Sequence, residues 1–562
     1  MKNFILFFIL FSFFGYSQCV TSTTWDGSAW SNGVPDASIN VLIDGLYDTG
    51  NDGSIDCCTL TVNAGANLTV SIGDYCNVSG HINVIPTGIL NVKSGGSLIP
   101  ISSTCIATGN INVERRTPST KRFDYTYWSS PVATTIGTAL LPTKWESNWT
   151  FTFNTPNFYD IETTYWGTYI SALPDGQDDN NDAWTRTNVA NNMIAGKGYA
   201  SMVKSIPAAG IYPRTEIVTF TGPLNTGTIN IPLSLSGNTL IDVDDFNLVG
   251  NPYSSAINSN DFIDTNISST SGTLYFWTHS NTLTTSYTGL AMYNFSTNDY
   301  AKYTKLGGVT AVFGGKKPTN VIGSCQGFFV EAETTDDLIF LPSFMSKAYV
   351  NTTAVAFFRE SEQKKPRNLW LNMANADGLF SQQLIGYNKE TDLSYNKGWD
   401  SRIVTITQIM KFYSVENNTK YDIQARGKWD DDDLVHLGYT SAISGDFTIS
   451  VDSKEGRMQN QDVYLYDSLF NSWHDLSEPY TFNTLPGEFN TRFFIQYEEP
   501  EDDEEDEDDH KLISSNHIDV YNMQGIKIDS LSCWCFDDLP KNQIFILKIH
   551  SGNKTKTIKY AK

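Results

Sequence analysis

The chain has 562 residues, and its 62 acidic residues against 38 Lys and Arg give a formal net charge of −24. A field of this sign repels phosphate backbones and anionic lipid, so nucleic acid is not expected as a partner. Short alternating apolar runs bounded by Gly, Asn and Pro dominate, and no segment carries a sustained helical stripe. This pattern predicts an all-β fold, and the length predicts several modules.

Residues 1–18 are predicted to be a signal peptide that is cleaved after Gln18. Lys2 is their only charge, and the apolar stretch from Phe4 to Phe14 is shorter than the roughly 20 residues that a membrane-spanning helix needs. The rival interpretation is a lipoprotein, because Cys19 follows at once, but a lipobox has a small residue where Gln18 stands. No later stretch is long and apolar enough to cross a membrane, so no membrane span is predicted.

Residues 19–116 are predicted to form a short β-solenoid-like module. The sequence repeats with a period near eight in units such as Asn63 to Val70 and Ile85 to Val92, which end in inward-outward-inward triplets. One unit cannot bury its apolar pair alone, so the units must stack in a right-angled solenoid or a small layered sheet. An ordinary meander of eight-residue hairpins is the alternative.

The next two segments, 117–346 and 347–497, are each predicted to be an antiparallel β-sandwich. Ile217 to Thr221 and Gly327 to Glu331 are typical strands of the first, and Asn368 to Met373 and Arg492 to Tyr497 of the second. Their period is close to two, with Gly, Asn and Pro turns between the strands.

An acidic linker at 498–511 precedes a small C-terminal module at 512–562. Eleven of the twelve residues from Glu498 to Asp509 are acidic, and such a run repels itself and stays extended. Gly525 permits a tight turn between the first two strands of the module. The inner faces of a small β-sandwich are predicted to consist of Val520, Ile526, Ile528, Ile544, Ile546 and Ile549.

Several segments resemble large β proteins exported by the type IX (Por) secretion system. They are Phe123 to Val132 (FDYTYWSSPV), Asn247 to Ile257 (NLVGNPYSSAI), Gln326 to Val330 (QGFFV), and the early motifs TTWDG and WSNG from Thr23 to Gly33. Ile518 to Gly525 (IDVYNMQG), with Leu539-Pro540, Ile544 to Ile549 (IFILKI) and Lys556 to Lys559 (KTIK), is similar to the C-terminal sorting domain of that group.

The resemblance implies an export route and a final location, and no catalytic activity. It implies that the type IX machinery is a partner through residues 512–562, that the tail is removed, and that the protein ends outside the cell, either released or on the outer surface. A plain fourth domain with a structural role is the alternative for the tail.

Five of the eight cysteines fall in the N-terminal module, and in an exported protein disulfides are expected there. Cys76 takes an inward position and Cys105 lies in a later coil, so a bridge between them across stacked coils is one expectation. Cys19 bonded to Cys57 or Cys58 is another, and the connectivity stays open. Cys533 and Cys535 lie two apart on a predicted strand, which suggests a local bridge or simple packing, and zinc is not expected.

No catalytic residue and no cofactor-binding residue is assigned. The sequence has no Gly-x-Ser-x-Gly elbow, no His-Glu-x-x-His and no Walker-type phosphate loop. The nearest motif, Gly323 to Gly327 (GSCQG), leads into a strand and not a helix, and the resemblance to the exported β proteins implies that it is a turn.

One loop is a candidate calcium site, because oxygen ligands crowded around a Gly suit a hard cation. A solvated turn rich in Asp and Asn is the alternative, and Asp430 to Asp433 is a weaker case of the same kind. The candidate ligands are Asp175, Asp178, Asp179, Asn181 and Asp182.

These features predict an exported multi-module β protein with an adhesive or structural role at the cell surface. The alternative is a secreted protein that binds or degrades polysaccharide, for which surface glycans are the partners. A glycosidase needs two carboxylates at a set separation, and the sequence offers too many pairs to choose one. Aromatic rings that could stack on sugars are Trp128, Trp166, Trp184, Trp277 and Trp399, and none is assigned to a site.

Overall fold

The computed structural model describes residues 19, 21–121, 124–140, 145–158, 183–203, 214–236, 245–278, 297–312, 314–349, 367–403, 410–500, 517–522, 527–531, 544–551 and 554–561. It is an all-β fold of several modules, as the alternating pattern predicts. The chain divides into two compact units, Met1–Glu498 and Glu499–Lys562.

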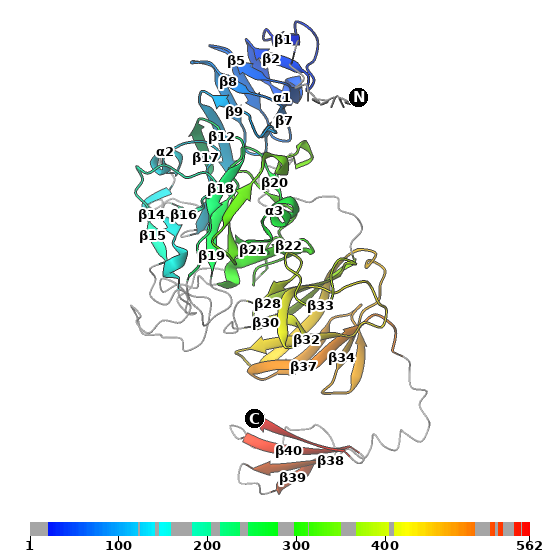
Figure 1. The fold of residues 1–562 in the computed structure, drawn as a ribbon. Helices are drawn as coiled ribbons and strands as arrows, with labels where there is room; N and C mark the ends of the chain where they lie inside the picture. The colour runs from blue at the N-terminus through cyan, green and yellow to red at the C-terminus, as the bar shows by residue number, and fades with distance from the viewer. Residues whose placement is uncertain are drawn as a thin grey trace, which may run out of the picture. The chain divides into compact units, whose positions relative to one another are not determined.

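The N-terminal module is a three-sided β-solenoid built from parallel strands (Figure 1). The first side holds β1 (Thr21–Trp25), β2 (Ile39–Ile43), β5 (Leu60–Val62), β8 (Ile82–Val84) and β11 (Ala107–Thr108). The second side holds β3 (Leu46–Asp48), β6 (Asn67–Val70), β9 (Ile89–Val92), β12 (Ile111–Arg116) and β17 (Ile217–Gly222). The third side holds β4 (Ile55–Cys57), β7 (Tyr75–Val78) and β10 (Ser97–Pro100), and the short helix α1 (Thr49–Asp52) lies between β3 and β4.

Each eight-residue repeat supplies one strand, so that one side of a coil is one repeat. A repeat therefore pairs with the third repeat after it, as Leu68 of β6 does with Leu90 of β9. The coil has three sides and is not right-angled as the repeat suggested. The inward residues of the triplets, among them Leu60, Leu68 and Leu90, are fully buried in one core.

Both ends of the solenoid core are covered. At the first end, the Trp25 indole donates to the Leu46 carbonyl at 2.7 Å, and its ring meets that of Trp30 at 5.3 Å. At the other end, β17 comes from the second module and pairs antiparallel with β12. The helix α2 (Ile136–Leu140) adds its buried side chains to the same core. Covering the ends protects exposed strand edges from pairing with other chains.

The second module is an antiparallel sandwich closed by a layer of aromatic rings. One sheet holds β13 (Tyr125–Trp128), β14 (Trp145–Phe153), β15 (Trp184–Arg186) and β16 (Tyr199–Val203). The other holds β19 (Phe246–Gly250), β21 (Thr270–Trp277), β22 (Tyr300–Thr304), β23 (Gly307–Val309) and β25 (Gly327–Ala332). Tyr127 and Phe153 of the first sheet meet Phe329 of the second at ring separations of 5.8 and 4.9 Å.

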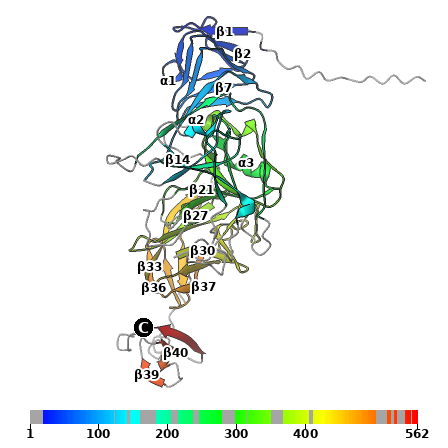
Figure 2. The ribbon, with the colours of Figure 1, turned by 90° about the vertical axis from the view of Figure 1, so that its left-hand side faces the viewer.

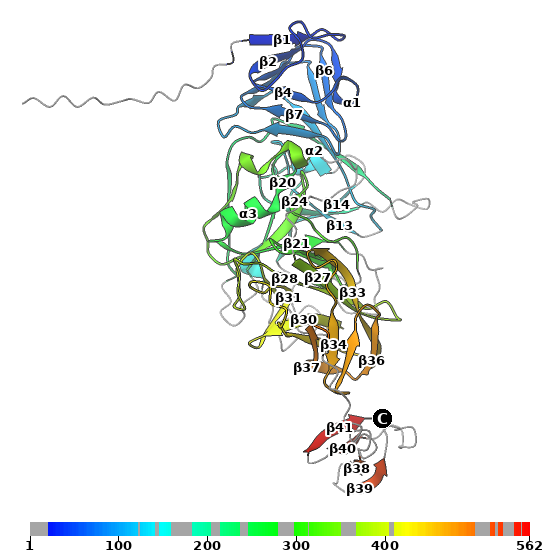
Figure 3. The same ribbon diagram turned by 90° about the vertical axis from the view of Figure 1, so that its right-hand side faces the viewer.

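The helix α3 (Ser259–Asn266) covers the outer face of the second sheet (Figure 3). Asn258 caps it by accepting from the amides of Asn260 and Asp261 at 2.8 and 3.3 Å. Its Phe262 packs on Phe328 and Phe340. Two short strand pairs complete this layer: β18 (Ile229–Pro232) with β26 (Asp337–Phe340), and β20 (Ile257–Asn258) with β24 (Val321–Ile322).

The third module is one large sheet that folds around a single core. Its strands are β27 (Arg367–Asn375), β28 (Phe380–Tyr387), β29 (Ser401–Arg402), β30 (Met410–Glu416), β31 (Thr419–Ala425), β32 (Val435–Ser441), β33 (Gly445–Gly456), β34 (Tyr464–Asp467), β35 (Ser472–Asp475), β36 (Tyr480–Thr484) and β37 (Gly487–Gln496). Figure 1 shows β32, β37 and β34 side by side, and Figure 2 shows β33 beside β36. Leu371 of β27, Phe447 of β33 and Phe493 of β37 all belong to the core.

The β22–β23 hairpin of the second module is hydrogen-bonded to the third. The Asn368 amide donates to the Leu306 carbonyl at 2.8 Å, and the Trp370 indole donates to the Gly308 carbonyl at 2.7 Å. Leu306 shares a small apolar cluster with Trp370 and Leu384. The two modules therefore meet over apolar contacts as well as polar ones.

The C-terminal unit contains one four-stranded antiparallel sheet in the order β39-β38-β40-β41. Val520, predicted to lie on an inner face, is buried, and Asp519 pairs with Lys527 across β38 and β39. The strands are β38 (His517–Asn522), β39 (Lys527–Leu531), β40 (Ile544–Ser551) and β41 (Lys554–Ala561).

The structure shows how Cys19 is paired and corrects one expectation about the other cysteines. Cys19 is bonded to Cys58, whereas Cys76 and Cys105 are both free thiols. The bridge between them was wrong because strands three repeats apart are neighbours: Cys76 lies opposite Leu98 of β10 and Ile55 of β4.

Candidate functional site

The predicted calcium ligands Asp175, Asp178, Asp179, Asn181 and Asp182 lie outside the described residues, so that site stays a prediction. In the described part of the chain, His, Cys, Asp and Glu form no group of three that could hold a metal ion. The weaker candidate, Asp430 to Asp433, is partly committed elsewhere: Asp433 pairs with Arg426, and Asp431 accepts from the Trp429 indole.

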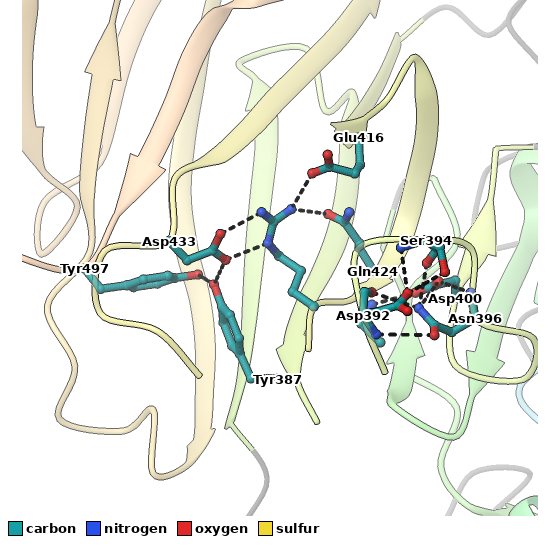
Figure 4. Close-up of polar contacts among 11 residues, drawn as sticks. Tyr387, Asp392, Ser394, Asn396, Asp400, Glu416, Gln424, Asp433 and Tyr497 are labelled. Atoms are coloured by element: carbon teal, nitrogen blue, oxygen red, sulfur yellow. Dashed lines mark hydrogen bonds and ion pairs between the residues drawn. The ribbon is translucent and has the colours of Figure 1, made fainter. Parts of the chain in front are cut away.

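The Arg426–Asp433 pair lies at the centre of a network that ties together four segments of the third module (Figure 4). Arg426 Nε and Nη2 donate to the two carboxylate oxygens of Asp433 at 2.6 and 2.7 Å. Its Nη1 donates to Glu416 and Gln424, both at 3.2 Å. Burial alone would lower the pKa of Arg426, but the hydrogen bonds and charge of Asp433 outweigh burial and raise it. This fork geometry holds the connection between β31 and β32 in place.

Two tyrosines extend this network into the core. The Tyr387 hydroxyl lies 2.7 Å from Asp433 Oδ2 and 2.9 Å from the Tyr497 hydroxyl. Burial first, then the neighbouring Tyr497 and Asp433, raises the pKa of Tyr387 well above its usual value. Both phenols thus stay neutral, and their partners are other groups of the fold.

Asp400 forms a second buried network beside the first (Figure 4). Its Oδ1 accepts from the Ala425 amide at 2.6 Å, and its Oδ2 accepts from the Asn396 amide at 2.6 Å. Burial raises its pKa to about 6, against the effect of these hydrogen bonds. Asp400 thereby fastens the loop before β29 to the end of β31. Both networks in Figure 4 hold loops together, and Arg426 and Asp400, on which they centre, are buried.

Four aromatic rings form a row on the face of the third module's sheet that points to solvent, away from the core. Trp473 of β35 pairs in register with Tyr466 of β34, Tyr466 with Phe494 of β37, and Phe494 with His436 of β32. Successive ring centroids are 4.9, 6.2 and 4.6 Å apart. Trp473 is 38% exposed and His436 is exposed, while Tyr466 and Phe494 are half-buried. We call these four residues the aromatic row.

The residues between them face the core, because side chains alternate across a strand. Leu465, Phe493, Ile495 and Val435 are all buried. The next outward positions carry polar groups, since Tyr464 lies opposite Asp475 on one side and Gln496 on the other. The Tyr466 hydroxyl donates to Asn471 Oδ1 at 2.7 Å. Successive ring planes are tilted by 42°, 53° and 74°, so the aromatic row is a corrugated apolar strip with hydrogen-bonding groups along its edges.

The tryptophans proposed from sequence are not on this surface. Trp128 is fully buried and donates to Ser201 at 2.9 Å. Trp184 and Trp277 pack in the aromatic layer of the second module, and Trp399 lies under the Lys305 ammonium at 4.5 Å. The fifth, Trp166, lies outside the described residues.

The segment Gly323 to Gly327, the one most similar to a Gly-x-Ser-x-Gly elbow, is a turn. The Gln326 amide donates to the Gly323 carbonyl at 3.2 Å, and β25 begins at Gly327. Burial raises the pKa of the Cys325 thiol to about 11, so the thiol stays protonated at neutral pH.

A family model described as "Domain of unknown function (DUF8693)" matches residues 17–497. The chain belongs to this family. The match spans the solenoid and both following modules and stops before the acidic run. No curated protein and no solved structure matches this DUF8693 chain. Within the described residues, no helix is long and apolar enough to cross a membrane.

Sequence reasoning missed the aromatic row, although its residues alternate as an exposed strand should. In Tyr464-Leu465-Tyr466 and Phe493-Phe494-Ile495, both faces carry aromatic or aliphatic residues. The period of two is visible, but it does not show which face is solvated. Tyr466 stands between Leu465 and Asp467, and Phe494 between Phe493 and Ile495. All four neighbours are buried, so the sequence holds no signal that separates these two rings from the core.

Proposed function

We propose that this chain is an exported β protein with an adhesive or structural interaction role, and that residues 512–562 act as its type IX sorting signal. The observation that carries the proposal is the separation of Glu499–Lys562 as a compact unit of its own. Such a unit can be recognised by a secretion receptor while the body stays folded. The final location is the cell surface or the medium.

Two further observations support this division of labour. The family match ends at residue 497, so the body is a family unit without the acidic run and the C-terminal sheet. The acidic run from Glu498 to Asp509 cannot bury apolar area and has the composition of a linker.

The body has the character of a rigid display scaffold. Its solenoid is covered at both ends, the β22–β23 hairpin bonds the second module to the third, and the polar networks of Figure 4 fasten its loops. A scaffold of this kind presents a fixed surface to a partner with little ordering cost on binding.

The test is secretion of a truncated chain from a host that has the type IX system. A chain ending at Tyr497 is expected to remain in the periplasm, while the full chain reaches the surface or the medium. As a matched control, residues 498–562 fused to a periplasmic reporter protein should carry the reporter out. Appearance of the truncated chain in the medium would refute the role of the tail.

A further inference from the structure

We propose that the aromatic row, Trp473, Tyr466, Phe494 and His436, binds a neutral polysaccharide chain. The proposal rests on the proposed function in one respect: a protein displayed outside the cell meets such polymers. The site itself stands on the geometry of β32, β37, β34 and β35.

The row is unusual for the solvated face of an antiparallel sheet. Such a face normally carries polar side chains that alternate with the buried ones. Here four strands in succession place a ring in the same register row. Cross-strand aromatic pairs stabilise a sheet by themselves, but they leave Trp473 38% exposed at the end of the row, with Phe470 nearby in sequence 52% exposed.

Ring stacking is the way in which proteins bind the apolar faces of sugar rings. Aromatic side chains offer a large rigid surface at low entropic cost, with polar groups at the edge to give orientation. The four rings follow one another at centroid separations of 4.9, 6.2 and 4.6 Å and are tilted by 42°, 53° and 74°, so each can contact a separate sugar ring and no common plane is needed. Asn471, Asp475 and Gln496 lie along the edges, where they can bond to hydroxyl groups.

Charge selects a neutral polymer over an acidic one. Neither the aromatic row nor the adjacent row of Asp475, Tyr464 and Gln496 contains Lys or Arg. Asp475 and the net charge of −24 repel uronic acids and sulfated sugars. Recognition therefore has to come from stacking and hydrogen bonds.

The experiment is calorimetric titration of the purified full chain with cellohexaose, laminarihexaose and xylohexaose, and with polygalacturonate as the acidic comparison. At least one neutral oligosaccharide is expected to bind, and Trp473→Ala should weaken its binding about tenfold. Trp473→Phe keeps an aromatic ring at this position, so it should retain most of the wild-type affinity. The matched control is Trp149→Ala, which removes a tryptophan of similar exposure, 37%, from the second module and should leave binding unchanged.

Three results would overturn the proposal: no binding to any neutral probe, equal loss in the two Ala variants, or tighter binding of polygalacturonate. Sedimentation is measured in parallel. A dimer of the wild-type chain that Trp473→Ala abolishes would assign the aromatic row to self-association instead. The binding measurement is independent of export. Secretion of the chain ending at Tyr497 would therefore refute the sorting role without contradicting glycan binding.

Discussion

The ammonium of Lys302 lies 2.7 Å from Oδ2 of Asp422, and this ion pair joins the second module to the third across a buried interface. Lys411 approaches the same oxygen at 3.0 Å, and all three side chains are almost fully buried. Burial would raise the pKa of Asp422, but the two lysines outweigh burial and lower it. Asp422 is therefore the charged centre on which the joint between the modules depends.

Replacing this carboxylate should be costly. Asp422→Asn leaves two buried lysines without their nearest counter-charge, and removal of one partner of a buried pair typically costs about 3–5 kcal/mol. We expect a loss of this size in urea-induced unfolding followed by tryptophan fluorescence. The control is Lys93→Gln, which breaks the pair with Glu114 on the solenoid surface and should cost less than about 1 kcal/mol. Equal losses would show that the joint does not depend on Asp422.

Glu331 predicts how stability depends on pH. It is buried in β25, and burial raises its pKa to about 7 from the usual 4.5, against a hydrogen bond from Ser271 and the charges of Arg402 and Lys302. Between these two values the folded state binds more protons than the unfolded state, so stability falls as pH rises through that window and is level above it. At 1.36 kcal/mol per pKa unit, the loss amounts to about 3 kcal/mol.

Glu331→Gln should remove most of this slope, because it keeps a hydrogen-bonding side chain and no longer titrates. The measurement is the melting temperature of both chains at about pH 5 and about pH 8. The variant should be the more stable of the two only at the higher pH. Asp400 still titrates in the variant, because burial raises its pKa to about 6. A smaller loss of stability with rising pH therefore remains. Parallel pH curves for both chains would contradict the assignment.

The fold could be predicted from sequence where one face of each strand is apolar. The triplets Leu68-Thr69-Val70 and Leu90-Asn91-Val92 alternate cleanly, and both are buried-outward-buried in β6 and β9. Which repeat pairs with which could not be predicted, because the angle at each corner, and not the period, decides whether a coil has two, three or four sides. Because the coil has three sides, Cys76 lies opposite Leu98 and not beside Cys105.

The candidate site could not be predicted for a different reason. Sequence analysis chose tryptophans by type, and a tryptophan such as Trp128 is as suited to a core as to a surface. The outward direction of Phe494 depends on how β32 and β37 are aligned, and their register shifts between Leu437 and Tyr439. The shift adds two residues to β37, an even number, so Phe493 and Phe489 both face the core, and the alternation alone does not show which face is solvated.

The Cys19–Cys58 bond should contribute to the stability of the first coil. It closes a sequence separation of 39 residues, for which the loop-entropy model gives about 4 kcal/mol. The variant Cys19→Ser/Cys58→Ser should melt at a lower temperature than the wild-type chain. A reducing agent should lower the wild-type melting temperature to that of the variant and leave the variant unchanged. If the reductant shifts both proteins equally, the bond is not the source of the effect.

Gly272 predicts how closely the second and third modules are packed. Its φ of +78° disfavours any other residue, and a Cβ placed there would lie 2.5 Å from the Cα of Gly398 in the third module. Gly33 has the same kind of backbone, with a φ of +81°, but nothing within 4 Å of the added Cβ. Gly33→Ala therefore isolates the backbone cost of about 1–2 kcal/mol, while Gly272→Ala adds the overpacking cost of about 1–3 kcal/mol. Thermal unfolding of the two variants should differ by that second amount, and equal destabilisation would mean that the modules do not touch at this glycine.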